Sequence, residues 1–204
     1  MRPRAMVLVG VVAVTALLSG CTGSGGEGGP TSRAVDEGSS PTALPTTGAV
    51  LAQQELAAPA VDSTSAPGGT MTVIVRSVAA SKGTTVVSWA MRWDNPAAAD
   101  GASVSLDKFL SGGWTPPVLT DGVALKLYYP LCPGGDWHTS QNADGCPSRA
   151  LYSPRYHFSY YSLTNHQTFE AWAVFPGLDT NTKTVDLALP TGLPAFAALP
   201  VTRP

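Results

Sequence analysis

In the C-terminal two thirds of the chain, apolar residues recur at every second position in several short runs. Residues 71–76 and 87–93 alternate in this way, and Ser81-Lys82-Gly83 between them is rich in turn formers. A period of two over a short run is typical of a strand with one buried face, so the pattern predicts a hairpin. Similar runs cover residues 125–129, 169–175, 185–189 and 196–201, and prolines at positions 116, 117, 130, 176, 190 and 194 separate them.

These runs define one domain, residues 67–204. A length of about 135 residues suits a single hydrophobic core. No stretch has a convincing helical period, although residues 105–111 have room for one or two turns. Many short strands separated by turns predict an all-β fold, a two-layer β-sandwich of immunoglobulin-like architecture. The Cys-Trp-Cys spacing of antibody domains is absent, because Cys132 and Cys146 are too close in sequence to bridge two sheets.

The N-terminus begins with Arg2 and Arg4, continues with the apolar residues 5–18, and reaches Leu18-Ser19-Gly20-Cys21. This combination predicts a secretory signal peptide over residues 1–20. The apolar run is shorter than the roughly 20 residues that span a bilayer. The four residues that end in Cys21 resemble a bacterial lipobox. That resemblance implies that Cys21 carries acyl chains such as palmitate and holds the exported chain at the extracytoplasmic face of the cell membrane.

Residues 21–66 are rich in Gly, Ser, Thr, Pro and Ala. This composition predicts a disordered linker between lipid and domain, with a reach of roughly 35 Å. The glycines at positions 23–29 lack the preceding strand and the following Gly-Lys-Ser/Thr of a nucleotide-binding loop. Residues 49–58 are more apolar, around Val50, Leu51 and Leu56. There we expect either a short helix docked on the domain or a solvated segment.

Charged residues make up 13% of the chain, and the formal net charge is -2. Because soluble proteins average about a quarter of charged residues, this chain offers little basic field for phosphate backbones, and we expect no nucleic-acid partner. It also has no polybasic sequence for lipid headgroups.

The sequence holds few signs of catalytic or metal chemistry. It has no Gly-x-Ser-x-Gly, no His-Glu-x-x-His and no Cys-x-x-Cys, which are the signatures of common hydrolases, metalloproteases and dithiol enzymes. Asp136, His138, Asn142 and Asp144 share one loop, but they lack the spacing of a calcium-binding loop. We therefore predict a protein that is not an enzyme and that holds no cofactor and no metal.

The cysteines fit an exported protein. Once lipidation takes Cys21, Cys132 and Cys146 remain as an even pair in an oxidising compartment, which predicts a disulfide between them. A thiolate metal site is the alternative, but His138 is the one further ligand nearby. The disulfide would hold Trp137 and His138 on a stiff exposed loop.

A second candidate surface is aromatic, with Tyr152, Tyr156, Phe158, Tyr160 and Tyr161 close together in sequence. Rings exposed in a row suit sugars or a partner protein. Alternatively, residues 156, 158 and 160 point inward from a strand and fill the core. The candidate binding surface from both segments consists of Trp137, His138, Tyr152, Tyr156, Tyr160 and Tyr161.

Four segments, residues 119–131, 169–176, 184–187 and 196–200, resemble a small extracytoplasmic domain of high-GC Gram-positive bacteria. The resemblance lies in apolar and proline positions, among them Pro130-Leu131 and Phe175-Pro176. In some of those proteins the domain precedes a peptidoglycan-binding module of the outer-membrane-protein-A type. The sequence ends at Pro204 without such a module, and the resemblance implies no catalytic residues.

Two classes of function follow from these observations. The first is a lipid-anchored, non-enzymatic module that binds or organises another envelope protein or a cell-wall glycan. The second is an extracytoplasmic receptor for a small ligand or metal ion, which would use the loop between Cys132 and Cys146 together with the aromatic segment.

Overall fold

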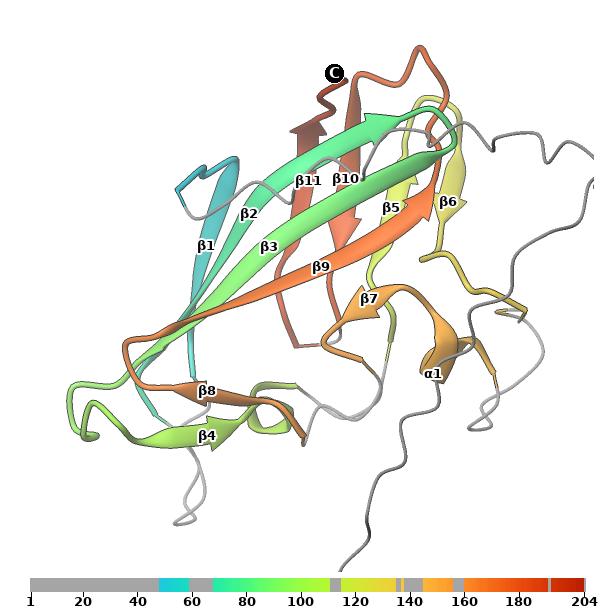
Figure 1. Cartoon of the computed structure of the whole chain (residues 1–204). Helices are drawn as coiled ribbons and strands as arrows, with labels where there is room; N and C mark the ends of the chain where they lie inside the picture. The colour runs from blue at the N-terminus through green and yellow to red at the C-terminus, as the bar shows by residue number, and fades with distance from the viewer. Residues whose placement is uncertain are drawn as a thin grey trace, which may run out of the picture. The chain divides into compact units, whose positions relative to one another are not determined.

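The computed structural model of the chain describes residues 48–58, 68–110, 115–134, 137, 145–155, 160–190 and 192–203. These residues form antiparallel β-strands with very little helix (Figure 1), which confirms the all-β prediction. The predicted signal peptide, Cys21 and the predicted linker before residue 48 lie outside the described residues, as do His138 and Tyr156. In chain order the elements are β1 (Ala52–Ala57), β2 (Thr70–Ser81), β3 (Thr84–Asp94), β4 (Ser103–Ser105), the 3-10 helix η1 (Leu106–Phe109), β5 (Val118–Asp121), β6 (Lys126–Tyr128), α1 (Cys146–Arg149), β7 (Tyr152–Ser153), β8 (Ser162–Thr164), β9 (Thr168–Pro176), β10 (Thr184–Ala188) and β11 (Ala195–Pro200).

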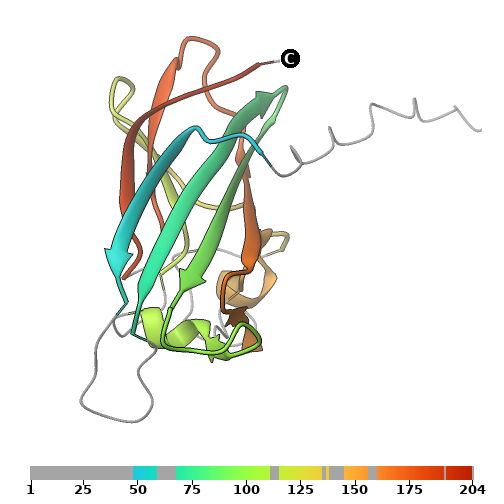
Figure 2. The same cartoon turned by 90° about the vertical axis from the view of Figure 1, so that its left-hand side faces the viewer.

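The strands form two larger sheets and a small one. The five-stranded sheet has the order β1-β2-β3-β9-β7, the four-stranded sheet has the order β11-β10-β5-β6, and β4 pairs with β8. The two larger sheets face one another (Figures 1 and 2), with one hydrophobic core between them. The arrangement is therefore sandwich-like.

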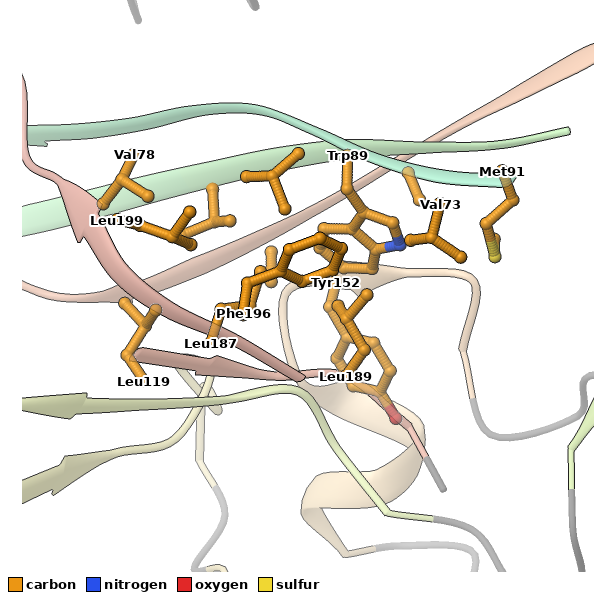
Figure 3. Close-up of a cluster of buried hydrophobic side chains, with 14 of the residues drawn as sticks. Val73, Val78, Trp89, Met91, Leu119, Tyr152, Leu187, Leu189, Phe196 and Leu199 are labelled. Atoms are coloured by element: carbon orange, nitrogen blue, oxygen red, sulfur yellow. The ribbon is translucent and has the colours of Figure 1, made fainter. Parts of the chain in front are cut away.

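The core is built from the alternating positions that the sequence pattern marks. Met71, Val73 and Val75 of β2 and every second residue of β3 from Val87 to Trp93 are buried. The facing sheet contributes Leu119, Val185, Leu187, Phe196 and Leu199, several of which Figure 3 shows in the same cluster as Trp89 and Val78. Burying one such side chain is worth about 1.5 to 3 kcal/mol. This contribution explains why a short period-two pattern is enough to fix the strands.

The predicted hairpin between the first two strong runs is confirmed. Residues from Thr70 to Ser81 pair with residues from Asp94 back to Thr84, and Lys82 and Gly83 form the turn. Gly83 has a φ of 86°, a left-handed conformation that glycine adopts without the steric cost of a Cβ. The 3-10 helix at Leu106–Phe109 fits the expected turn or two within residues 105–111.

The expectation for residues 49–58 was wrong. They form neither a docked helix nor a solvated segment, because Ala52–Ala57 is strand β1, paired with β2 from Ala52↔Val75 to Ala57↔Thr70. The edge of β2 carries backbone groups that need hydrogen-bond partners, and this need outweighs the helical preference of Ala, Gln, Glu and Leu. The folded part therefore begins inside the segment expected to be linker, and not near Pro67.

Several turns meet at one end of the sandwich, which we call the β5–β6 end. There Gly177 N donates to Gly83 O at 2.9 Å, so the β9–β10 connection touches the β2–β3 turn. Thr182 Oγ1 donates to Asp121 Oδ2, which joins the same connection to the β5–β6 turn. Figures 1 and 2 show both turns at the same end of the domain as the end of the described chain.

Candidate binding surface

The disulfide fixes the base of the loop that contains Trp137. The Sγ atoms of Cys132 and Cys146 lie 2.13 Å apart, as in a bonded pair, which agrees with the predicted disulfide. Next to Cys132, Leu131 N donates to Val174 O at 2.7 Å, and Leu151 N donates to Leu131 O at 2.8 Å. Both ends of the loop are therefore held against β9.

Trp137 does not project from this loop as expected. Its Nε1 donates to Pro130 O at 2.8 Å, and its ring lies 5.7 Å from the ring of Tyr129 in a tilted arrangement. The indole is half-buried. The hydrogen bond to Pro130 O stabilises the half-buried indole, because an indole N–H that is removed from water without an acceptor costs free energy. His138, its neighbour in the prediction, lies outside the described residues.

A shallow groove lies beside this contact. It has a volume of about 330 Å³, and we call it the edge groove because it follows strand β6, the last strand of the four-stranded sheet. Leu127, Tyr129, Pro130, Trp137 and Pro176 are among its lining residues. Its walls are thus mainly apolar and aromatic, and the disulfide-bonded Cys132 is also among the lining residues.

The aromatic segment does not form the predicted surface. The prediction that Tyr152 lies on the surface was wrong, since the residue is 1% exposed and lies in the core (Figure 3). The cause is its register: β7 pairs Tyr152 with Ala173, a buried residue of β9, so both side chains face inward. Tyr161 is half-buried and packs edge-on against Phe169 at 5.9 Å. Tyr160 is exposed, and Tyr156 lies outside the described residues.

A different apolar surface follows the β5–β6 hairpin. Val123, Leu125, Leu127 and Tyr129 are 94%, 87%, 60% and 36% exposed. The period-two run at residues 125–129 was therefore identified correctly as a pattern, but its apolar residues face solvent. The physical reason is again register, because Tyr128 pairs with the buried Leu119 and takes the inward side, which leaves the outward side to its neighbours. No local signal marks that choice.

A second groove, of about 670 Å³, lies at the β5–β6 end between residues 121–124 and 178–184. Its buried carboxylate, Asp121, is already saturated: Thr182 Oγ1, Val123 N and Ala124 N all donate to it. The Thr182 hydrogen bond, followed by the backbone ones, holds the pKa of Asp121 below its usual value. Its role here is to fix the turn.

A charged pair involves Asp179, one of the residues that line this groove. Lys126 Nζ lies 2.7 Å from Asp179 Oδ2, and both side chains are about half exposed. The hydrogen bond and the charge of Asp179 raise the pKa of Lys126. Surface pairs of this kind add little to the free energy of folding. The main effect of the pair is to fix the position of the Lys126 side chain.

The opposite end of the domain carries the one histidine in the described part of the chain. His166 Nδ1 lies 2.8 Å from Asp94 Oδ1, and His166 Nε2 lies 3.8 Å from Asp100 Oδ1. Burial raises the pKa of Asp94, but hydrogen bonds from His166 and Arg92 outweigh it and lower the pKa overall. Both ring nitrogens of His166 face carboxylates. A histidine that acts as a general base has one ring nitrogen within hydrogen-bond reach of a nucleophile, and His166 does not show this arrangement among the described residues.

The described residues contain no group of three or more His, Cys, Asp or Glu side chains placed to hold a metal ion. Asp136, Asn142 and Asp144 of the predicted oxygen-rich loop lie outside them. Across the same part of the chain, no helix has the length and apolar character to cross a membrane.

The comparisons with known proteins identify no relative. No protein-family model, no curated protein and no solved structure gives a significant match to the chain. The resemblance to extracytoplasmic domains of high-GC Gram-positive bacteria stays a prediction.

Proposed function

We propose that this chain is a lipid-anchored protein on the extracytoplasmic face of a bacterial cell membrane, and that its domain is a non-enzymatic binding module. The anchor rests on Leu18-Ser19-Gly20-Cys21 and on the basic and apolar residues before it. The disulfide-distance pair of cysteines supports an oxidising compartment. Stable anchoring takes about two acyl chains, which lipidation of Cys21 provides.

We propose further that the domain is an immunoglobulin-like sandwich. In immunoglobulin domains one sheet has the strand order A-B-E-D and the other contains G-F-C, with C′ added at the edge in some domains. Strands β2-β3-β9-β7 follow the first order and β11-β10-β5-β6 the second. In this assignment β1 is an added strand beside strand A. The architecture places loops at two ends and leaves β6 as an outer edge.

The observation that carries the binding role is the edge groove beside this outer strand. Leu127 and Tyr129 expose apolar surface at an edge of the sheet where, among the described residues, no further strand pairs with β6. Natural proteins usually protect such edges with charges, prolines or covering segments. An apolar side-chain groove next to open backbone suits an extended apolar segment of another envelope protein.

Site-specific photo-crosslinking in the native bacterium tests this proposal. A photoreactive phenylalanine analogue at Leu127 should give one discrete protein adduct, whereas the same analogue at the exposed Ala97 should give none. Substituting Trp137→Ala should remove the adduct, because it removes one wall of the groove. An adduct between position 127 and a wall glycan would show that the groove binds a sugar and not a protein. Identical adducts at both positions would refute a specific site.

The anchor has its own test. With Cys21→Ala, the protein should leave the membrane fraction and the detergent phase after phase separation. Retention of the variant in the detergent phase would show that the anchor lies elsewhere.

A further inference from the structure

We propose that the β5–β6 end of the domain contacts the surface of the lipid bilayer, with Val123 and Leu125 inserted at the interface and basic side chains on anionic headgroups. This inference rests on the proposed lipid anchor. It concerns a different surface from the edge groove, and we call Val123 and Leu125 the apolar tip.

The apolar tip is held rigidly in an outward position. Val123 and Leu125 are 94% and 87% exposed at the turn of the β5–β6 hairpin. Asp121 accepts hydrogen bonds from Val123 N at 3.0 Å and from Ala124 N at 2.9 Å, so the turn is anchored to the buried carboxylate. Leu125 has a φ of 53°, a left-handed conformation that glycine or asparagine adopts more easily. A large apolar residue at such a position is consistent with a binding role.

Basic residues from four separate segments gather around the tip. Lys82 lies in the β2–β3 turn, Lys126 starts β6, Lys183 precedes β10, and Arg203 follows β11. Arg203 donates to Thr182 O and to Asp179 O, each at 2.8 Å, which fixes it beside the β9–β10 connection. The described carboxylates at or near this end are Asp121, which is buried, Asp179, which pairs with Lys126, and Asp186, which is exposed on β10 and accepts a hydrogen bond from Ala198 N.

The opposite end has a different distribution of charge. Asp94 and Asp100 lie in or next to the β3–β4 connection and Asp107 lies in η1, together with Arg92 and Lys108. The β5–β6 end therefore combines basic residues with exposed apolar side chains. An apolar tip surrounded by cations matches the interface of an anionic membrane, where apolar side chains enter the headgroup region and each Lys or Arg adds attraction.

The N-terminal end of the described chain lies on the same side of the domain. Leu51 N donates to Val75 O, and Arg76 Nη1 donates to Ala49 O at 3.2 Å. Since β1 is antiparallel to β2, Ala49 lies beside the half of β2 that ends at the β2–β3 turn. About 27 residues separate Cys21 from Gly48, and a flexible coil of that length spans roughly 30 Å. A lipid on Cys21 thus keeps the β5–β6 end within reach of the bilayer.

Depth-dependent fluorescence quenching on the full lipidated chain tests the contact. A single cysteine is introduced at Ala124 in the tip or, as a matched control, at Ala97 at the opposite end, and is labelled with an environment-sensitive dye. Cys21 is lipidated and Cys132 is bonded to Cys146, so neither competes for the label. The vesicles contain phosphatidylcholine, phosphatidylglycerol and a lipid with a headgroup nitroxide.

Both labelled chains should float with the vesicles, and the dye at position 124 should be quenched at least threefold more than the dye at position 97. Val123→Ser with Leu125→Ser, or vesicles without phosphatidylglycerol, should abolish the difference. Equal quenching at both positions of floating protein would overturn the membrane contact and leave the anchor intact. Failure of both chains to float would refute the anchor and this contact with it.

Other occupants of the tip have distinct outcomes in the same assay. Envelope proteins added to the vesicles could remove the quenching at position 124 and shift the emission of the dye to the blue. That result would assign the tip to a protein partner. Self-quenching between dyes at position 124, rising with protein density on the vesicle, would assign it to a second copy of the chain. Either result would overturn the bilayer contact.

Discussion

The buried side chain of Asn165 should contribute strongly to the stability of the domain, because of the hydrogen bonds that the tertiary structure gives it. Its side chain is 1% exposed and lies between β8 and the β3–β4 connection. Oδ1 accepts from Asn95 N at 2.8 Å, and Nδ2 lies within 3.2 Å of the carbonyl oxygens of Asn95, Ala98 and Ala99. One amide therefore takes the place of a strand partner for the backbone of that connection.

Asn165→Ala should lower the free energy of unfolding by about 2 to 4 kcal/mol. The substitution leaves one amide N–H and at least two carbonyl groups without their partner, and an unsatisfied buried group costs about 1 to 3 kcal/mol. The carbonyls are near solvent, so water replaces part of what they lose. The free energy of unfolding of such a domain falls by about 2 kcal/mol per M urea. The urea concentration at half unfolding, measured by tryptophan fluorescence, should therefore fall by about 1 to 2 M.

The isosteric variant Asn165→Asp sharpens the test. At pH 7 it keeps the acceptor but directs a charged oxygen at three carbonyl oxygens, so it should be at least as destabilising as alanine. Burial and repulsion raise the pKa of this new carboxyl group, so its penalty should shrink as the pH falls below that raised value. Gln167→Ala, an exposed neighbour, should stay within about 0.5 kcal/mol of wild type. The reasoning fails if Asn165→Asp is as stable as wild type at pH 7.

Two further predictions concern the disulfide and the β5–β6 turn. Reducing the Cys132–Cys146 bond, or replacing both residues by alanine, should cost about 3 kcal/mol, because a loop of about 15 residues gains that much chain entropy when it opens; an unchanged melting temperature would contradict a stabilising role. The lowered pKa of Asp121 stabilises the fold above its ordinary value of 3.8, and this contribution disappears as the pH falls through the lower folded value. The stability difference between wild type and Asp121→Asn should therefore be constant from pH 7 to 5 and should shrink below pH 4, and a constant difference down to pH 3 would contradict this reasoning.

Much of the strand content is visible in the sequence. The runs at residues 71–76 and 87–93 show their buried positions directly, because a strand with one face in the core must alternate. The β2–β3 turn is marked by Gly83, and the pairing of Cys132 with Cys146 follows from counting cysteines in a chain whose N-terminus predicts export. Each of these inferences needs only neighbouring residues or simple elimination.

The candidate site was not visible in this way. Tyr152 was expected on a surface and is buried, whereas Leu125 and Leu127 belong to a period-two run and are exposed. A period of two says that one face is apolar, but not which face meets the core. That choice depends on the partner strand, and for Tyr152 and Leu127 the partners lie in β9 and β5.

The sequence by itself therefore determined the all-β class and the hairpin of β2 and β3, and the export signal ending at Cys21 stays a prediction. Only the tertiary structure decided that residues 52–57 form an edge strand and that Lys82, Lys126, Lys183 and Arg203 meet at one end. The sequence has no polybasic stretch because these cations are at least 20 residues apart. Sheet pairing brings their turns together, and long-range pairing is the property that local patterns do not encode.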